Sequence, residues 1–249
     1  MTQDAKTGTT AVILAAGLSS RLRPLTNEVP KCLLPMGDKT ILDWQLYALT
    51  SIGMTDVHMV VGYRKEVIMA HVREAWPDLH CTFIENEEYA QTNTLFSLAS
   101  AFRAMPPRDF FYLNADVVFH KDIVAALDQH VEGAFLATDC KQCREEEVKV
   151  RVVDGRIVEI SKEVDPEVAL GEFIGIAKFS GAFVHAFRET VLRLAVNGNE
   201  RRYFEFALDA MTRDQVLTPV DITGIPCVEV DFAEDYHYAV SYVVKHFTT

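Results

Sequence analysis

Short apolar runs alternate with amphipathic stretches along the first half of this chain. The apolar runs have the length of buried strands, and they cover 12–15, 57–61, 81–84 and 110–113. Apolar positions recur at helical spacing in the stretches between them, which cover 40–53, 64–75 and 93–104. Strands that alternate with helices are typical of a parallel sheet with crossover helices. We therefore predict an α/β fold with a Rossmann-like, doubly wound sheet.

The second half of the chain has a different pattern. Two apolar segments flank Asp154-Gly155, a residue pair typical of a two-residue hairpin turn. Further strands are predicted at 171–179, 217–222 and 228–230, and helices at 181–195, 202–212 and 233–246. Pro219 places one of these strands at a sheet edge. We interpret this half as a β-hairpin and helix extension that shares the core of the first half.

The polar segment 1–9 is predicted to be a short disordered arm. Residues 10–249 are predicted to form a single domain, because no linker, low-complexity run or internal repeat interrupts them. We divide this domain into a first half, 10–130, and a second half, 131–249. In a doubly wound sheet the ligand lies at the carboxyl ends of the strands, where the strand order reverses. We expect the segment 16–31 and Asp116 to meet there.

Composition and charge exclude several classes of protein. The chain has 249 residues, of which 49% are hydrophobic, and its apolar runs are too short for a membrane span. A net charge of −12 argues against a nucleic-acid surface. Segment 1–9 has no apolar signal region and the five cysteines are scattered, so we expect a cytoplasmic protein with reduced thiols. Cys140 and Cys143 have CxxC spacing without a second pair, so an incidental pair is favoured over a metal or redox site. The sequence leaves the oligomeric state open, a homodimer included.

Segment 11–35 concentrates small and cationic residues directly after the first predicted strand. It reads AVILAAGLSSRLRPLTNEVPKCLLP. Gly17, Ser19 and Ser20 allow close backbone approach and present N–H groups to phosphate oxygens, while Arg21 and Lys31 supply positive charge. This combination predicts a triphosphate cradle; the alternative is an ordinary turn with two solvated cations. A dinucleotide fingerprint is excluded because only the first of its three glycines is present.

Motifs in this segment resemble the signature of the nucleotidyltransferase superfamily that makes NDP-sugars, CDP-choline and related activated metabolites. They are Ala15-Ala16-Gly17, Arg21-Leu22, Pro24-Leu25-Thr26, Pro30-Lys31 and Leu34-Pro35. One departure is Ser19, which stands where the superfamily usually has a second glycine. The resemblance implies a GT-A-like mixed sheet and catalytic roles for Arg21 and Lys31. It implies a nucleotide cradle formed by Ala15, Ala16, Gly17, Leu18, Ser19, Ser20 and Arg21.

Two aspartates end predicted buried strands, at Asp116 and Asp231. A carboxylate at the carboxyl end of a strand offers the hard oxygen ligand that Mg²⁺ prefers. The alternative for each aspartate is a turn or capping role. The resemblance implies that Asp116 and Asp231 bind Mg²⁺ and that Asp116 also contacts the acceptor. Asp235 is expected at the N-cap or first turn of the closing helix.

The residues expected to bind the acceptor lie in the second half. Lys162 resembles the superfamily lysine that grips the acceptor's phosphate; the alternative is a solvated lysine. Glu172, Tyr203, Phe204 and Glu205 offer carboxylates and aromatic faces to a small ammonium group. In the alternative, the aromatic rings pack a helix and the glutamates face water. A primary amine favours a carboxylate and a trimethylammonium favours an aromatic cage, and the sequence does not decide between them.

The segment 85–98 joins a predicted strand to a helix start. Its polar side chains at Asn93, Thr94 and Ser97 are expected to bind the nucleotide base, although Asn93 is equally suited to cap the helix. The pattern in this segment resembles the branch that transfers CMP to phosphocholine or 2-aminoethylphosphonate more than the branch that makes NDP-sugars.

These observations together indicate a magnesium-dependent cytidylyltransferase. In the expected reaction, an oxygen of a small phosphate or phosphonate acceptor attacks the α-phosphorus of CTP in line, and pyrophosphate leaves. No protein nucleophile is required. One alternative is a sugar-1-phosphate nucleotidyltransferase. Another is an inactive nucleotide-sensing homologue, against which Asp116, Asp231 and Lys31 argue.

Overall fold

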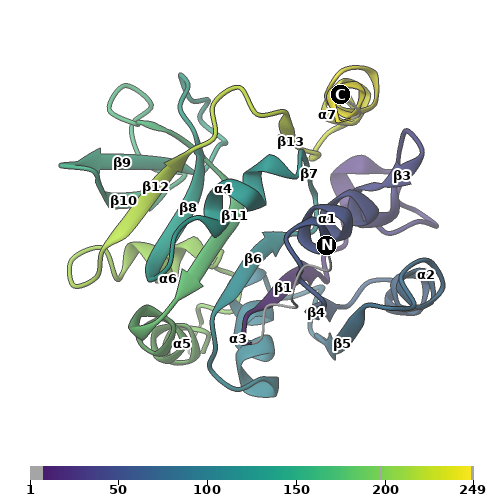
Figure 1. Cartoon of the computed structure of the whole chain (residues 1–249), viewed down its shortest axis with the longest axis horizontal. Helices are drawn as coiled ribbons and strands as arrows, with labels where there is room; N and C mark the ends of the chain where they lie inside the picture. Colours follow the sequence, from purple (N-terminus) through teal and green to yellow (C-terminus); the bar gives the residue numbers. More distant parts are fainter. Residues whose placement is uncertain (1–7, 197, 248–249) are drawn as a thin grey trace.

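A mixed β-sheet forms the centre of the computed structural model, which describes residues 8–196 and 198–247. Four parallel strands lie side by side at one end of the sheet, in the order β5-β4-β1-β6 (Figure 1). Their bounds are β1 Thr10–Ala15, β4 Asp56–Val61, β5 His80–Glu85 and β6 Phe110–Asn114. Each strand predicted for the first half is therefore present. The predicted arm at 1–9, apart from its last two residues, lies outside the described residues.

Antiparallel strands continue the sheet beyond β6. Strand β11 pairs with β6, β8 and β9; β10 completes a hairpin with β9, and β12 pairs with β8. The bounds are β8 Gly133–Asp139, β9 Lys149–Val153, β10 Arg156–Ser161, β11 Gly171–Ser180 and β12 Leu217–Asp221. The predicted hairpin turn is confirmed, since Asp154 and Gly155 both have positive φ, 50° and 74°. Strand β12, which contains Pro219, lies at an edge as predicted.

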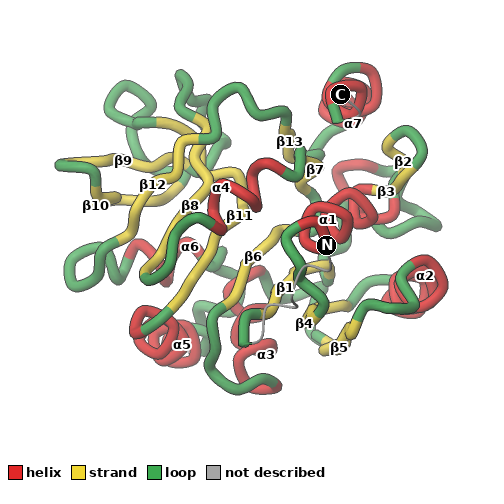
Figure 2. Tube along the Cα trace, in the orientation of Figure 1, coloured by secondary structure: helices red, strands yellow, loops and turns green. Residues whose placement is uncertain are grey.

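Helices cover both faces of the sheet (Figures 1 and 2). The residues of β1 alternate between two buried clusters, with Val12 and Leu14 in one and Ala11 and Ile13 in the other. The first cluster includes side chains of α3 Thr94–Ala104, α5 Ala182–Leu194 and α6 Glu205–Asp209. The second includes side chains of α1 Ile41–Ser51, α2 Lys65–Ala75 and α4 Asp122–Asp128. Helix α6 is shorter than the predicted 202–212.

A third apolar cluster joins residues 22–44 to the C-terminal part of the described chain. Helix α7 Ala233–Ser241 and the 3₁₀ turn η3 Val243–His246 pack against Leu22, Met36 and Trp44. Two small sheets adjoin this cluster: β2 Pro35–Met36 pairs with β3 Lys39–Thr40, and β7 Val117–Phe119 pairs with β13 Cys227–Glu229. The predicted helix at 233–246 is therefore α-helical only in its first part.

The strand order reverses between β1 and β6, as the doubly wound pattern predicts. These strands are parallel neighbours with Leu14 opposite Asn114, so their carboxyl ends meet at the same edge of the sheet. The cradle segment follows β1 through the 3₁₀ turns η1 Ser20–Leu22 and η2 Lys31–Leu33. Asp116 follows β6. The fold thus brings segments about a hundred residues apart to one edge.

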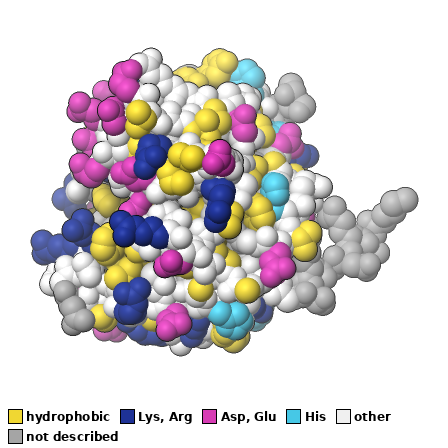
Figure 3. Space-filling view, turned by 90° about the vertical axis from the view of Figure 1, so that its left-hand side faces the viewer, with side chains coloured by type: hydrophobic (Ala, Val, Ile, Leu, Met, Phe, Trp, Pro, Cys, Tyr) yellow, Lys and Arg dark blue, Asp and Glu magenta, His cyan; other side chains and the backbone are white. Residues whose placement is uncertain are grey.

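The surface and the thiols add two observations. On the face shown in Figure 3, hydrophobic side chains are scattered among charged ones, and Lys and Arg side chains lie across its centre. None of the helices among the described residues has the length and apolar character needed to cross a bilayer. All five cysteines of the chain are free.

Candidate active site

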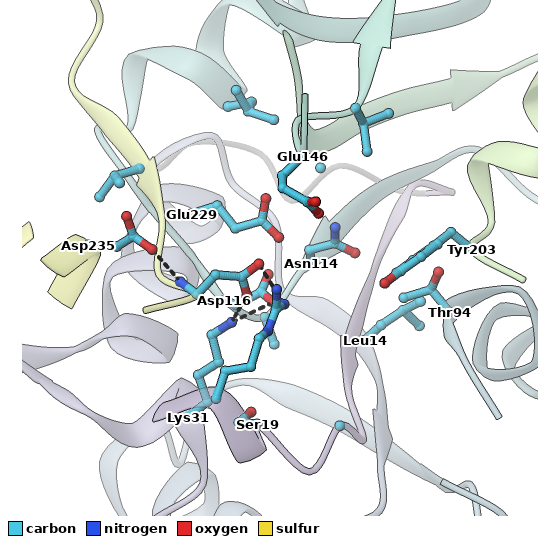
Figure 4. Close-up of a pocket in the computed structure, with 18 of the residues that line it drawn as sticks. Leu14, Ser19, Lys31, Thr94, Asn114, Asp116, Glu146, Tyr203, Glu229 and Asp235 are labelled. Atoms are coloured by element: carbon cyan, nitrogen blue, oxygen red, sulfur yellow. Dashed lines mark hydrogen bonds and ion pairs between the residues drawn. The ribbon is translucent and has the colours of Figure 1, made fainter. Parts of the chain in front are cut away.

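A cavity of about 810 Å³ opens at the carboxyl ends of β1 and β6. Nearly all the residues that the sequence suggests for the site line this cavity. They are Ala15, Ala16, Gly17, Ser19, Arg21, Lys31, Asn93, Thr94, Ser97, Asp116, Lys162, Glu172, Tyr203, Glu205 and Asp231. Leu18 and Ser20 do not line it, because the chain turns at Ser19 into η1 and leaves Ser20 exposed. In Figure 4, Tyr203 and Thr94 lie across the cavity from Lys31 and Asp235.

Three carboxylates converge at one end of the cavity. Asp116, Glu229 and Asp231 each place an oxygen within 4.8 Å of the others. Asp116 follows β6, whereas Glu229 ends β13 and Asp231 comes two residues later. The sequence analysis assigned no role to Glu229. The feature that points to Glu229 is its position two residues before Asp231, because side chains two residues apart in an extended segment lie on the same face.

Two cations pair with the aspartates of this cluster. The Nζ of Lys31 lies 3.0 Å from Asp116 Oδ2 and 2.7 Å from Asp231 Oδ1, and Arg21 donates to Asp231 Oδ2 at 2.6 Å. Burial alone would lower the pKa of Lys31, but the two aspartates outweigh burial and raise it. Burial would raise the pKa of Asp231, but Lys31 and Arg21 hold it below its usual value. Lys31 and Asp231 are therefore both charged at neutral pH.

The same cluster still lacks positive charge. Burial, together with the charges of Asp116 and Asp231, raises the pKa of Glu229 well above its usual value. Asp116 Oδ1 is buried and has no hydrogen-bond partner within the described part of the chain. Hard carboxylate oxygens that are close together and incompletely paired suit a divalent cation such as Mg²⁺. The donor set therefore fits such an ion.

Neighbouring residues fix the cluster in place. Gln45 of α1 is fully buried, and its Nε2 donates to the carbonyl oxygens of Asn114 at 2.8 Å and Val117 at 2.7 Å, on either side of Asp116. Asp235 Oδ2 accepts hydrogen bonds from the backbone N–H groups of Asp231 and Phe232. Asp235 thus caps the first turn of α7, as predicted.

The cradle segment has a backbone suited to close approach of a ligand. A Cβ built on Gly17 would meet no heavy atom within 4 Å, so this residue borders open space. Ser19 has a φ of 49°, in the left-handed region that favours glycine, which fits the glycine usual at this position in the superfamily. Its carbonyl oxygen accepts a hydrogen bond from Thr26 Oγ1 at 2.9 Å.

The polar residues expected near the base also have structural partners. Asn93 is the N-cap of α3, where its Oδ1 accepts from the Thr94 N–H at 2.8 Å. Thr94 Oγ1 accepts from the Phe204 N–H, and Ser97 Oγ accepts from Asn86 Nδ2. Asn93 therefore both caps the helix and lines the cavity, so the two alternatives for this residue are compatible.

The aromatic residues expected at the acceptor end have different environments. Phe204 is fully buried and packs on Tyr112 with ring centroids 3.9 Å apart, so it is a core residue. Tyr203 lines the cavity, and the Nζ of Lys162 lies 5.3 Å from the centre of its ring. A carboxylate oxygen of Glu146 lies 3.8 Å from this ammonium. Lys162 is thus held at the cavity wall.

Glu172 belongs to a charged group that the sequence analysis did not anticipate. Lys141 Nζ lies 2.6 Å from Glu172, 3.3 Å from Glu147 and 3.5 Å from Asp139. These four side chains line the cavity and carry a net negative charge. Burial raises the pKa of Glu172, although Lys141 opposes this shift.

A buried lysine holds the adjacent loop. Lys149 is 1% exposed, and its Nζ donates to the carbonyl oxygens of Arg144, Glu145 and Glu147. The loop 144–147 carries Arg144, Glu146 and Glu147 into the cavity wall. Lys149 therefore organises part of the cavity wall although it is not itself a lining residue.

Comparisons with known proteins agree with this geometry. Residues 11–172 match the family model described as a MobA-like NTP transferase domain. A CTP:phosphoglutamine cytidylyltransferase from Campylobacter jejuni is 30% identical over 248 residues, which cover 90% of this chain and 96% of that protein. A mannose-1-phosphate guanyltransferase from Gibberella zeae is 30% identical over 223 residues, covering 86% of this chain and 58% of that protein. The solved structure of a CTP:phosphocholine cytidylyltransferase from Streptococcus pneumoniae has a TM-score of 0.76 at 22% identity, over 94% of this chain and 98% of that one. This structural likeness establishes the α/β fold.

Proposed function

The chain belongs to the MobA-like NTP transferase family and is a nucleotidyltransferase, and from this premise we propose that it is a cytidylyltransferase. It transfers CMP from CTP to a small phosphate or phosphonate acceptor and releases pyrophosphate. The observation that carries the proposal is the convergence of Asp116, Glu229, Asp231 and Lys31 on one cavity that also contains Gly17. The cytidylyltransferase from Campylobacter, which matches along nearly its whole length, supports the choice of nucleotide.

Each group of residues has a separate role in an in-line transfer of CMP. An acceptor oxygen forms a bond to the α-phosphorus of CTP while the bond from that phosphorus to the bridging oxygen breaks, and pyrophosphate leaves with the electron pair. Arg21 and Lys31 stabilise the charge that develops on the leaving group, and Lys162 binds the acceptor's phosphate. The cradle at 15–21 binds the triphosphate, and Asn93, Thr94 and Ser97 contact the base.

The carboxylates have a separate task. Asp116, Asp231 and Glu229 would hold Mg²⁺, which supplies positive charge to the phosphates when bound. Asp116 also borders the acceptor. Asp235 and Gln45 keep these groups in place through backbone hydrogen bonds, so the cluster is organised before a ligand binds.

A second candidate is a sugar-1-phosphate nucleotidyltransferase. The similarity to a mannose-1-phosphate guanyltransferase favours it, although this chain spans 58% of the length of that protein. An inactive nucleotide sensor would have no need for three carboxylates converging with Lys31, so the site argues against that alternative.

Pyrophosphate release separates these candidates. The purified chain is assayed with ATP, CTP, GTP and UTP against phosphoethanolamine, phosphocholine, 2-aminoethylphosphonate and mannose-1-phosphate, with Asp116→Ala as the inactive control. We expect turnover with CTP and at least one small acceptor, and none in the variant. Turnover confined to mannose-1-phosphate would support the second candidate, and absence of turnover with every pair would support a sensor.

A further inference from the structure

Glu205 is a buried carboxylate at the wall of the cavity. Resting on the proposed function, we propose that the acceptor of this enzyme carries a protonated amine with free N–H groups, and that the carboxylate of Glu205 binds this amine. A quaternary ammonium and an uncharged sugar are thereby excluded as the preferred acceptor.

The first argument is the state of the Glu205 side chain. Glu205 lines the cavity, yet it is only 6% exposed, and its Oε2 is buried without a hydrogen-bond partner in the described residues. A buried carboxylate that lacks a partner destabilises the folded protein. An ammonium group would supply both the missing donor and the opposite charge. A ligand with free N–H groups can therefore donate the hydrogen bond that Glu205 Oε2 lacks among the described residues.

The second argument is that no neighbouring cation already fills this role. The charged groups that face Glu205 are Lys162, which follows β10, and Asp116, which follows β6; the buried hydroxyl of Tyr112 is also near. The ammonium of Lys162 lies over the Tyr203 ring and beside Glu146, and it makes no ion pair with Glu205 among the residues described. Lys162 is thus free to bind the acceptor's phosphate while Glu205 takes the amine.

The third argument concerns aromatic faces. A trimethylammonium group has no N–H donor and is bound by several open aromatic faces. At this end of the cavity Phe204 and Phe173 are 0% and 2% exposed, which leaves Tyr203, 46% exposed and with Lys162 Nζ 5.3 Å from its ring centre, as a single accessible ring among the described residues there. The other aromatic rings of the wall lie elsewhere: Phe232 follows Asp231 in the chain, Tyr238 belongs to α7, and Tyr89 lies beside Gly62. The described residues around Glu205 therefore do not form an aromatic cage.

The fourth argument is the charge of the cavity wall. Ten carboxylates and five cations line the cavity. Outside the suggested metal site with its two cations Arg21 and Lys31, the carboxylates are Asp139, Glu146, Glu147, Glu172, Glu205, Glu234 and Asp235, and the cations are Lys141, Arg144 and Lys162. A wall of this sign favours an acceptor with a cationic group over a neutral sugar. An alkylamine is protonated at neutral pH, since its pKa is close to the roughly 10.4 of lysine.

Phosphoethanolamine and phosphocholine make a matched test because they share one phosphate and one carbon chain and differ only in the three methyl groups. We measure kcat/KM for both with CTP, in the wild type, Glu205→Gln and Glu205→Asp, with the exposed Glu167→Gln as the control variant. We expect the wild type and the control to prefer phosphoethanolamine by at least about 10-fold. A charged hydrogen bond of this kind corresponds to a loss of about 10- to 100-fold for phosphoethanolamine in Glu205→Gln, with KM for CTP unchanged.

Other outcomes would overturn the inference. Equal or better use of phosphocholine by the wild type would do so without any variant, so the test does not depend on the folding of Glu205→Gln. An increase in KM for CTP in Glu205→Gln would assign the residue to the nucleotide instead. If mannose-1-phosphate were the only acceptor used, the proposed function itself would fail, which is a distinguishable result.

Discussion

The backbone N–H of Val230 donates a hydrogen bond of 2.9 Å to the carbonyl oxygen of Asp116. This bond joins the segment after β6 to the segment at the end of β13, and these two segments together carry the three converging carboxylates. Because the backbone holds these segments together, the loss of one carboxylate should leave the positions of the others largely unchanged. The acids can therefore be tested one at a time.

Asp116→Asn should abolish turnover while the protein remains folded. The substitution keeps the shape of the side chain but removes the charge that would hold a divalent cation, and we expect kcat to fall by about 10²-fold or more. Pyrophosphate release measures the loss, and circular dichroism checks the fold. Asp78→Asn, in an exposed turn, is the matched control. Turnover at the wild-type rate in Asp116→Asn would show that Asp116 is not needed to bind the metal ion.

Lys31→Met should destabilise the protein across the neutral pH range. Removing one partner of a buried ion pair leaves uncompensated charge and costs about 3 kcal/mol. Asp231, whose pKa Lys31 helps to lower, contributes this stability above its unfolded pKa of about 3.9. Lys31, whose pKa is raised, contributes it below about 10.4. Urea denaturation should show a large difference from wild type at pH 7 and a small one at pH 3; equal differences would contradict the ion-pair origin.

Gln45→Leu tests whether the support under Asp116 affects catalysis. The variant leaves the carbonyl oxygens of Asn114 and Val117 without their donor, at a cost of about 1–3 kcal/mol. We expect a lower free energy of unfolding and a lower kcat, with little change in KM for CTP, because Gln45 does not line the cavity. An unchanged kcat in the folded variant would show that the loop keeps its geometry without Gln45.

Lys149→Met should act on the acceptor end alone. The buried ammonium holds three carbonyl oxygens of the loop 144–147, and its loss should loosen the wall that carries Glu146 and Glu147. A loss of about 1 kcal/mol in acceptor binding corresponds to a several-fold increase in KM for the acceptor. We expect KM for CTP to stay within about twofold of the wild type. The exposed Lys121→Met serves as the control. Equal increases in both KM values would indicate a general loss of structure.

Glu205→Gln should be more stable than the wild type at alkaline pH. Burial raises the pKa of Glu205 to about 7, so the folded protein must ionise a buried carboxyl as the pH rises from about 4.5 through 7. Wild-type stability therefore decreases over this range relative to the variant, by up to about 3 kcal/mol. Thermal denaturation at pH 4.5 and pH 8 checks this; a difference of the same size at both would assign the effect to packing.

Much of the fold could be predicted because the hydrophobic pattern of the first half is regular. The predicted strands and helices there lie within two residues of those observed, and Asp116 and Asp231 meet Lys31 as expected. Residues 117–139, with β7, α4 and β8, received no assignment. Their apolar runs are short and follow one another closely, so the periodicity does not separate a strand from a helix.

The residues that support the site were harder to predict. Gln45 is a polar residue inside an amphipathic helix, and Lys149 is a lysine in a strand; both patterns normally indicate solvent exposure. Their partners are backbone carbonyl oxygens, whose positions depend on the tertiary structure. Glu229 was missed for a related reason, since a lone glutamate in a short apolar strand reads as an outward-facing side chain.

The packing of Leu22 with Val243 and Val244 has a consequence for biosynthesis. The turn that presents Arg21 is translated well before its apolar anchor and before Asp231, which is 210 residues further along the chain. A nascent chain can therefore hold this turn in place only after Asp231 and residues 243–244 have been made. A message that ended after residue 172 would still encode the whole segment matched by the family model, but its product would lack both Asp231 and the anchor.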